Sequence, residues 1–245
     1  MPPCFEKMMS SDAKRYALLC PTRGRPERAR IFADSALATA ARPQAVDILL
    51  YVDADDPTRA DYQDAFPAEG PVSLVIGPAV GVPRAANMLC ERTAAEVLMT
   101  ANDDQVYIDH GWDERLGQET ARYRDGIYCL WFNDGWEAEN FCTFPIVSRR
   151  WVETLGYLQF PFFEHFFADT WIWMLAKAVD RAHFIADILV EHRHWKTGKG
   201  EMDDTYARHA TRPGDSRHAR DRAVIDRFER YFHADVEALR RAMSA

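Results

Sequence analysis

The feature that most constrains this chain is a short apolar strand that runs directly into acidic residues. Residues 96–101 read Glu-Val-Leu-Met-Thr-Ala, and Asn102, Asp103 and Asp104 follow at once. Open α/β sheets bind ligands at the edge where their strands end. Mg²⁺ and Mn²⁺ take carboxylate ligands in such places, with phosphate oxygens completing the shell. Because Asn and Asp also favour turns, a plain turn after a buried strand is the alternative interpretation.

Three earlier segments have the same form, an apolar run that ends in a polar or glycine-bearing loop. These runs are residues 16–20, 46–52 and 71–76, and helical stretches are predicted over 27–41 and 83–93. Strands that alternate with helices indicate a mostly parallel sheet with helices on its faces. We therefore expect one α/β domain of Rossmann-like architecture.

Composition is typical of a single enzyme domain. The chain has 245 residues, of which 47% are hydrophobic, enough for one full core. It contains no run of about 18 apolar residues, so no membrane-spanning helix is predicted. Residues 1–15 lack the apolar core of a secretory signal and are expected to be a disordered leader. Five scattered cysteines without a CxxC pair indicate reduced thiols in a cytoplasmic protein.

The order of these segments resembles the nucleotide-sugar glycosyltransferases of GT-A fold, especially their family 2-like branch, over residues 16–195. In that family the first strand ends in Pro-Thr-x-x-Arg, which holds the nucleotide. Pro21, Thr22 and Arg25 match this motif here. The resemblance implies a GT-A-like domain with a nucleotide-binding half over 16–104 and an acceptor half over 105–195.

The resemblance also implies further donor and metal residues. An acid after the second strand contacts the base or ribose in that family, and Asp53 is the best match here, with Asp55 next. The metal-binding Asp-x-Asp element closes the fourth strand and is represented by Asn102, Asp103 and Asp104. We expect Asp104 to bind the metal. Asp103 is expected to face the sugar or ribose and is the second candidate ligand, while Asn102 belongs to the donor site.

The second half is expected to form the acceptor side. It is dense in aromatic residues, most of which suit ordinary core packing, although rings also suit sugar faces or a stacked base. Trp136 follows Gly135 on a predicted turn and is expected to be exposed. Trp136 and Glu137 are therefore the expected acceptor contacts.

An acid also heads a predicted apolar helix that runs to Lys177. In the resembling family an acid at the start of this helix deprotonates the acceptor hydroxyl, which implies Asp169 as the base and Glu164 as the substitute. The helix dipole would lower the basicity of a carboxylate at this position. A structural N-cap is the alternative interpretation of Asp169.

Two histidines follow the apolar strand predicted over 183–190. The two-residue period of a strand places His192 and His194 on the same side. Some GT-A enzymes complete the metal site with a histidine after the last strand, which implies His192 first and His194 second. Mixed Asp and His ligation suits Mn²⁺ better than Mg²⁺. Ordinary hydrogen bonds at a strand end are the alternative.

The end of the chain is expected to contain a closing loop and one C-terminal helix. Residues 196–206 hold two glycines and two lysines, and this segment is predicted to close over the donor diphosphate and exclude water. Lys199 and, after the third strand, Arg84 are further expected donor contacts. Residues 216–243 have helical spacing and are predicted to form the C-terminal helix.

The His-x-His, Gly-Lys and Asp-x-Thr-Tyr series after the last strand resembles the ends of glycosyltransferase-like proteins of phages and prophages. This likeness implies a hydroxymethylated pyrimidine in phage DNA as one acceptor class, beside a glycan. The net charge of −8 disfavours binding to a polyanion. Residues 193–230 carry ten Lys and Arg against seven Asp and Glu, which suits either a solvated helix face or a nucleic-acid patch.

We therefore expect a metal-dependent glycosyltransferase that uses Mn²⁺ or Mg²⁺ and a nucleoside diphosphate sugar, by family default a UDP-sugar, in the cytoplasm of a bacterium or a phage-infected host. An acid placed for in-line attack favours inversion. One alternative is a nucleotidyltransferase of related fold, although the first loop here contains only Gly24 rather than a long glycine-rich run ending in Lys. The other is a non-catalytic sugar- or nucleic-acid-binding module.

Overall fold

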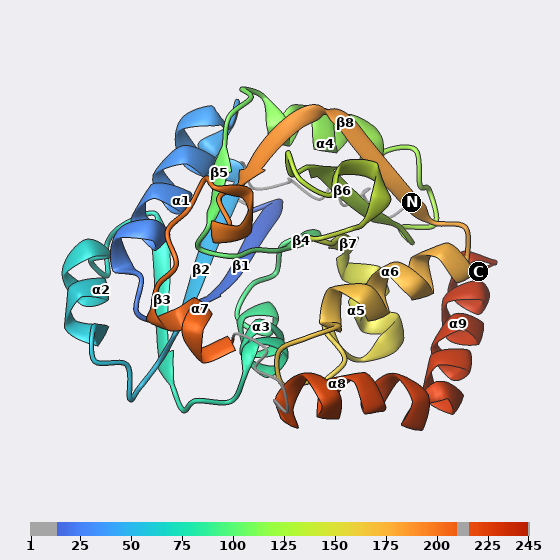
Figure 1. Ribbon diagram of the computed structural model, residues 1–245. Helices are drawn as coiled ribbons and strands as arrows, with labels where there is room; N and C mark the ends of the chain where they lie inside the picture. Colours follow the sequence, from blue (N-terminus) through green and yellow to red (C-terminus); the bar gives the residue numbers. More distant parts are fainter. Residues whose placement is uncertain (1–13, 210–215, 245) are drawn as a thin grey trace, which may run out of the picture.

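A central β-sheet organises the molecule. The computed structural model describes residues 14–209 and 216–244, and within them eight strands form one sheet of order β3-β2-β1-β4-β7-β6-β8-β5 (Figure 1). The strands are β1 (Tyr16–Thr22), β2 (Val46–Asp53), β3 (Val72–Gly77), β4 (Val97–Thr100), β5 (Gln105–Tyr107), β6 (Cys129–Asn133), β7 (Ile146–Ser148) and β8 (Ala182–His192).

Most neighbouring strands of this sheet run parallel. β1 pairs in parallel with both β2 and β4, and β2 pairs in parallel with β3. β7 lies antiparallel between β4 and β6, β6 runs parallel to β8, and β5 closes the far edge antiparallel to β8. The mostly parallel sheet predicted from the sequence is confirmed.

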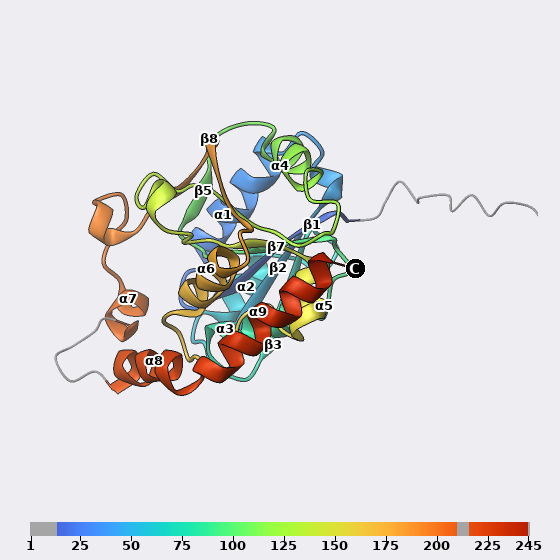
Figure 2. The ribbon, with the colours of Figure 1, turned by 90° about the vertical axis from the view of Figure 1, so that its right-hand side faces the viewer.

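Helices cover both faces of the sheet because the strand side chains alternate in direction. Tyr16, Leu18 and Cys20 pack into one core with α1, α2 and α4, while Ala17 and Leu19 pack into the other with α3, α5, α6 and α9. Figure 2 shows α1 and α4 above the sheet and α3, α5, α6 and α9 below it. The helices are α1 (Pro26–Thr39), α2 (Arg59–Ala65), α3 (Val82–Cys90), α4 (Trp112–Thr120), α5 (Arg149–Leu155), α6 (Ala168–Ala178), α7 (Asp204–His209), α8 (Ser216–Arg227) and α9 (Glu229–Met243).

Local signals explain several helix ends. Pro26 occupies the first turn of α1, where its missing N–H costs nothing. Ser148 caps α5 by accepting a hydrogen bond from the Trp151 N–H (2.9 Å), and Gly156 ends the same helix in the left-handed conformation (φ 82°). These short-range signals explain why α1 begins at Pro26, one residue before the predicted helix, and why α5 is confined to Arg149–Leu155.

The structure differs from the sequence-based expectation in three places. The short elements α2, α4 and β5 were not predicted, since each is brief and its sequence lacks a long apolar period. The expected single helix over 216–243 is two helices, α8 and α9, which meet at Phe228. The segment 196–206, predicted as a closing loop, overlaps a 3₁₀ turn, η3 (Trp195–Thr197), at its start and the short helix α7 at its end.

The expected leader lies almost entirely outside the described residues, which begin at Lys14. Lys14 Nζ donates a hydrogen bond to the Val46 carbonyl (3.0 Å), and the Arg15 N–H donates to the Ala45 carbonyl (2.8 Å). These two residues therefore already belong to the fold. Within the described part of the chain, no helix is long and apolar enough to cross a membrane.

The register of the sheet brings several loops to one edge. Thr22 at the end of β1 pairs with Val52 of β2, and Leu19 pairs with Thr100, the last residue of β4. The loops after these strands consequently emerge side by side at the carboxyl edge, where open α/β sheets bind ligands.

Candidate donor and acceptor site

A cavity of about 810 Å³ opens at this edge of the sheet. Its volume lies within the range of about 300–1,000 Å³ that is typical of small-molecule sites. Its walls come from the loops after β1, β2, β3, β4 and β6, the start of α6, the end of β8 and the segment from η3 to α7. One cavity is therefore lined by both halves of the domain.

Asp103 is held by the loop that follows β1. Its Oδ2 accepts a hydrogen bond from Thr22 Oγ1 (2.6 Å), and its Oδ1 accepts one from Arg25 Nη1 (2.9 Å). The carboxylate is buried, and burial raises its pKa above the ordinary value; the charge of Arg25 acts against the rise and neighbouring Asp104 adds to it. Both oxygens of Asp103 are thus already engaged by the protein.

Asp104 differs from Asp103 because only one of its carboxylate oxygens has a hydrogen-bond partner among the described residues. Its Oδ2 accepts a hydrogen bond from the Tyr206 hydroxyl (2.6 Å) and lies 3.3 Å from His192 Nε2. Its Oδ1 is buried and has no hydrogen-bond partner among the described residues. Burial works against the charge of this carboxyl, but the hydrogen bond and charge of His192, followed by the Tyr206 hydrogen bond, lower its pKa below the ordinary value.

His192 is fixed between acids and rings. Its backbone N–H donates to the Asp134 carbonyl (2.9 Å), and its Nδ1 lies 4.0 Å from Asp134 Oδ2. The rings of Trp136 and Phe144 pack against the imidazole at centroid distances of 5.3 and 4.9 Å. The imidazole is therefore buried with Nε2 directed toward Asp104.

Asp134 organises the turn that carries Trp136. Its Oδ1 accepts the N–H groups of Trp136 and Ala138 (both 2.9 Å), and its Oδ2 accepts the Thr143 hydroxyl (2.9 Å). This turn stacks Trp136 on His194 at a centroid distance of 5.1 Å and an interplanar angle of 25°. Trp136 is 40% exposed, as expected from the sequence, and it lines the cavity.

The other histidine is poorly suited to carry a positive charge. Burial and the neighbouring His192 lower the pKa of His194 to about 4, so its imidazole is neutral near pH 7. Its Nδ1 accepts a hydrogen bond from the Lys196 N–H (3.2 Å). This bond starts the turn η3 and places Lys196 at the cavity, whereas Lys199 Nζ forms an ion pair with Glu191 (2.9 Å) outside its lining.

Arg25 connects the start of the chain to its end. Its Nη1 binds Asp103, while its Nε and Nη2 bind the two oxygens of Asp203 (2.8 and 2.7 Å). The ring of Tyr206 lies against the guanidinium, 3.9 Å from centroid to Cζ. The segment after η3 is thereby attached to both Arg25 and Asp104.

A second arginine joins the loops after β1 and β2. Arg23 Nη1 donates to Asp53 Oδ2 (2.9 Å) and to Asp55 Oδ1 (2.5 Å). Asp53 and Arg23 line the cavity, and Asp55 does not. Gly24, in the left-handed conformation (φ 68°), donates its N–H to Asp56 Oδ2 (2.8 Å) and completes the tight turn before α1.

Asp169 stands at the start of α6 and also lines the cavity. Its Oδ1 accepts the Thr170 N–H (2.6 Å) and lies 3.3 Å from the Thr170 hydroxyl, so it does not cap the helix by accepting from a residue two or three positions on. No Lys, Arg or His forms an ion pair with it in the described part of the chain. Burial raises the pKa of Asp169 to about 6, against the lowering effect of the Thr170 hydrogen bonds.

The cavity gathers most of the residues predicted from the sequence. Those that line it are Pro21, Thr22, Arg25, Asp53, Asn102, Asp103, Asp104, Trp136, Glu164, Asp169, His192 and His194. Four predicted residues lie outside the lining: Asp55, Arg84, Glu137 and Lys199. Arg84 is exposed and donates to the Pro161 carbonyl (3.2 Å).

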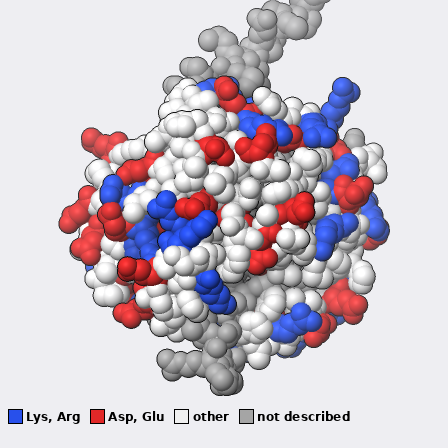
Figure 3. All heavy atoms as spheres, turned by 45° about the horizontal axis from the view of Figure 1, so that its top comes forward, with Lys and Arg blue, Asp and Glu red and all other residues white. Residues whose placement is uncertain are grey.

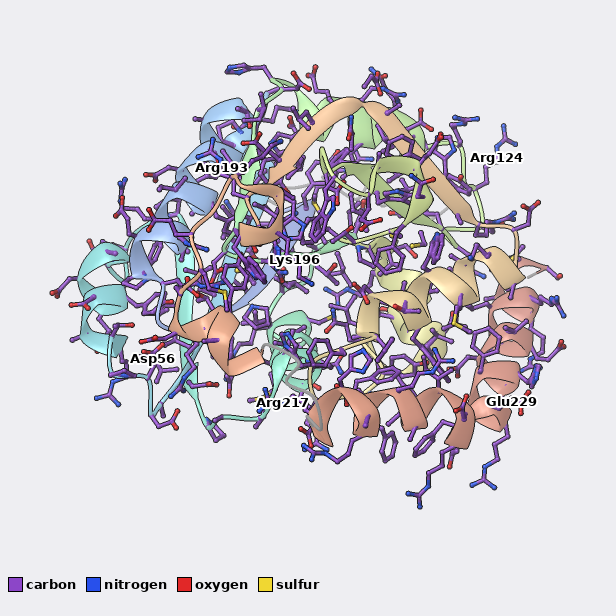
Figure 4. The ribbon with its side chains drawn as sticks, in the orientation of Figure 1. Asp56, Arg124, Arg193, Lys196, Arg217 and Glu229 are labelled. Atoms are coloured by element: carbon purple, nitrogen blue, oxygen red, sulfur yellow. The ribbon has the colours of Figure 1, made fainter. Side chains whose placement is uncertain are left out.

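Several lining residues were missed by sequence reasoning. Tyr206 and Thr205 belong to the segment 196–206 that was predicted to close over the donor, although neither was named as a contact. Lys196, His165 and Arg217 line the cavity as well. In Figure 4 Lys196 and Arg217 project from different elements, η3 and α8. Nothing in the local pattern distinguishes these side chains from other polar residues of the chain.

The fit of a metal ion depends on Asp104 and His192. Across the residues that the structure describes, no group of three or more His, Cys, Asp and Glu side chains is arranged to hold a metal ion by itself. The unpartnered buried Oδ1 of Asp104 and the adjacent imidazole of His192 nevertheless form a suitable partial donor set. Divalent ions in nucleotide sites commonly take one or two protein ligands and complete their shell with phosphate oxygens and water.

Comparison with known proteins identifies the fold. No protein-family model matches the chain, and no curated protein matches its sequence. TarS from S. aureus is similar with a TM-score of 0.59 and 8% identity, over 72% of this chain and 36% of TarS. TarS 1–349 in complex with UDP gives a TM-score of 0.57 and 9% identity, over 72% of this chain and 59% of that one.

A third structure matches almost the whole chain. The mannosyltransferase PcManGT from Pyrobaculum calidifontis, in complex with GDP-Man and Mn²⁺, gives a TM-score of 0.59 and 10% identity, over 94% of this chain and 86% of that one. The chain spans less than two thirds of each of the two TarS structures but most of the mannosyltransferase. At these identities the likeness establishes the fold, and the chain has the GT-A-like α/β fold of nucleotide-sugar glycosyltransferases.

Proposed function

We propose that this protein is a metal-dependent glycosyltransferase that moves a sugar from a nucleoside diphosphate to an acceptor hydroxyl. The observation that carries the proposal is the shared cavity. Its lining holds Asp103 and Asp104, which follow β4, and Asp169 at the start of α6. Residues 16–104 supply the donor wall and residues 105–195 most of the acceptor wall, while η3 and α7 form the cover.

The donor side would hold the nucleotide and its diphosphate. Asp53 and Arg23 stand where a base or ribose would meet the ends of β1 and β2, and UDP is the family default. Asp104 and His192 would hold a divalent metal, Mn²⁺ in preference to Mg²⁺ because one ligand is a nitrogen. When bound, such an ion neutralises negative charge that develops on the leaving diphosphate. Asp103, with both oxygens engaged, would instead fix the loop of Thr22 and Arg25 in place.

Lys196 is the stronger candidate for a direct contact with the diphosphate than Lys199. Arg23 and Arg25, which also line the cavity, are paired with acids, whereas no ion pair of Lys196 with an acid occurs in the described residues. An ammonium group without a carboxylate partner can bind phosphate without first breaking an ion pair. Lys199 would first have to leave Glu191.

The chemistry needs a base on the acceptor side. The acceptor oxygen attacks the anomeric carbon of the sugar, its proton passes to the Asp169 carboxylate, and the bond from that carbon to the phosphate oxygen breaks. The nucleoside diphosphate leaves with the electron pair. A carboxyl with a pKa of about 6 is a stronger base than an ordinary aspartate and is still ionised near pH 7. Attack opposite the leaving group would invert the anomeric centre.

The acceptor side would present Trp136 as a platform. Its exposed ring suits the apolar face of a sugar or a stacked base. The sequence suggests two acceptor classes, a saccharide hydroxyl and a hydroxymethylated pyrimidine in DNA. Figure 3 shows Lys and Arg interspersed with Asp and Glu on the face turned to the viewer. This mixture, with the net charge of −8, favours the saccharide.

A donor panel tests the proposal. UDP-, GDP-, CDP- and dTDP-sugars are added with and without Mn²⁺ while the unfolding temperature is followed. Ligand at 100 times its Kd adds roughly 2.7 kcal/mol of stability. A nucleotide sugar with a radiolabelled sugar group is then incubated with the protein and, in separate reactions, with saccharides, hydroxymethylated DNA duplexes and unmodified DNA duplexes. Metal-dependent stabilisation and labelled product support the proposal. Stabilisation without transfer or hydrolysis would indicate a binding module, and nucleotide transfer would indicate a nucleotidyltransferase.

A further inference from the structure

The loop that leads into α6 is held by a carboxylate from a distant helix. Asp221 of α8 is 1% exposed. Its Oδ1 accepts the N–H of Glu164 (2.8 Å), and its Oδ2 accepts the N–H groups of His165 (3.0 Å) and Phe166 (2.8 Å). Three consecutive backbone donors therefore converge on one buried side chain.

This loop, residues 164–166, is part of the acceptor wall. All three of its residues line the cavity. Phe167 follows in the left-handed conformation (φ 65°), and α6 begins at the next residue with Asp169 in its first turn. A displacement of the 164–166 loop would therefore move the cavity wall and the start of the helix that carries the proposed base.

Other contacts between α8 and this loop also hold the loop in place. Arg220 Nη2 donates to Glu164 Oε2 (2.8 Å), and the His218 ring packs against Phe166 and Phe167 at centroid distances of 5.1 and 4.9 Å. On the other side the Glu164 carbonyl accepts the Val82 N–H (3.2 Å) at the start of α3. Figure 1 shows α8 alongside the loop that leads into α6.

The chemistry of the position calls for a carboxylate. A buried carboxylate without a cation is costly unless hydrogen bonds satisfy it, and in the described residues Asp221 forms no ion pair, only these three charge-assisted bonds. An amide in its place would present one acceptor and one NH₂ group, and the NH₂ would face a backbone N–H. The site offers three donors and no acceptor, so Asp is matched to it and Asn is not.

We infer that Asp221 is a positioning residue of the acceptor side, which fixes the 164–166 loop and through it Asp169. This inference rests on the proposed function. Asp221 does not line the cavity, so its effect on transfer passes through the loop. The donor wall touches this loop at Val82, but the proposed nucleotide and metal residues Asp53, Asp104 and His192 lie on other elements and, in the part of the chain that the structure describes, do not contact Asp221.

The test compares Asp221→Asn with Asp226→Asn, the same change at an exposed position of the same helix. Calorimetry gives the Kd of the nucleotide sugar with Mn²⁺, and labelled donor gives transfer to acceptor and hydrolysis by water. In Asp221→Asn we expect a donor Kd within about twofold of wild type. The transfer rate should fall by up to about 10²-fold, because misplacement of reacting groups by about 1 Å can cause such a loss. The ratio of hydrolysis to transfer should rise. Asp226→Asn should match wild type in all three.

Two results would overturn the inference. One is unchanged transfer in Asp221→Asn, and the other is an equal loss of donor binding and transfer, which a merely structural role would give. If Asp221→Asn does not fold, His218→Ala is measured instead, because it removes an exposed ring that packs between α8 and the same loop. Donor Kd and transfer rate are compared as before, and unchanged transfer or an equal loss of both would again overturn the inference. A wild-type protein that transfers and hydrolyses no nucleotide sugar would overturn the proposed function and this inference together, whereas an active wild type with a normal variant overturns the inference alone.

Discussion

The two walls of the cavity differ in the side chains that surround their carboxylates. On the donor wall, Asp103 and Asp104 are met by cationic or polar side chains, Arg25 and Thr22 for the first and His192 and Tyr206 for the second. On the acceptor wall, Asp169 accepts hydrogen bonds from Thr170, the next residue in the chain, and forms no ion pair with a Lys, Arg or His of the described residues. The donor wall therefore holds charge that neighbouring side chains compensate, and the acceptor wall holds a carboxyl that burial has made more basic.

This difference supports the separate tasks proposed for the two acids. The pKa of Asp104 lies below its ordinary value because of His192, despite burial, while burial raises the pKa of Asp169 to about 6. A carboxyl that stays ionised suits a metal, and one with a raised pKa suits proton transfer. Titratable groups whose environments push their pKa values apart are a common mark of divided acid and base roles.

The largest effect is expected from removing the base. Asp169→Asn keeps size and one hydrogen-bond acceptor but no longer accepts a proton, so transfer should fall about 10²–10⁴-fold. Donor and Mn²⁺ affinity, measured by calorimetry, should stay near wild type because the donor wall is intact. The wild-type rate should also fall as the pH drops below about 6, when Asp169 becomes protonated. Full transfer by Asp169→Asn would remove the contrast between the walls, and Glu164 would be tested next.

The second effect concerns the metal. Asp104→Ala removes the carboxylate whose Oδ1 has no hydrogen-bond partner, and we expect the Mn²⁺-dependent part of donor affinity to disappear while the protein still folds. His192→Ala should weaken it less, because water can replace one ligand. Titration of donor with and without Mn²⁺ measures both variants. Unchanged Mn²⁺ dependence in Asp104→Ala would contradict the assignment, and a larger loss in His194→Ala would shift the second ligand to that residue.

The donor wall was the more predictable of the two. Thr22, Asp53 and Asp104 follow strands whose apolar runs are visible in the sequence, and parallel pairing brings such strand ends to one edge. A local pattern was sufficient because the sheet supplies the long-range geometry. Asp169 was found only through resemblance to a family, since its N-terminal helix position alone also suits a cap.

Residues that depend on single long-range contacts escaped prediction. Tyr206 reaches Asp104 across 102 residues, Asp203 reaches Arg25 across 178, and Asp221 reaches Glu164 across 57. No periodicity encodes such pairs. A related reason applies to Lys199, the lysine that the sequence analysis named. It lies outside the cavity lining whereas Lys196 lies in it, because the turn η3 decides which lysine faces the cavity.

That pair of lysines gives a third, smaller effect. Lys196→Ala removes a cation that lines the cavity, and the loss of one charge-assisted hydrogen bond costs about 1.5–3 kcal/mol, so the donor KM should rise by roughly 10-fold or more. Lys199→Ala, which breaks only the pair with Glu191, should change the donor KM little. Steady-state kinetics with varied donor measures both. A larger effect at Lys199 would mean that the 196–206 segment changes its position when donor binds.

The smallest expected effect is on stability, and its sign should differ between the walls. A carboxyl whose pKa is raised on folding contributes stability at low pH that is lost as the pH rises through its folded pKa, and one whose pKa is lowered contributes stability above its unfolded pKa. In metal-free buffer at pH 8, Asp169→Asn should therefore unfold at a higher temperature than wild type and Asp104→Asn at a lower one. The gain in Asp169→Asn should shrink between about pH 6 and pH 4, where wild-type Asp169 becomes protonated. Thermal unfolding at pH 8, 6 and 4.5 measures this. Shifts of the same sign in both variants at pH 8 would show that the two walls do not differ in how they hold charge.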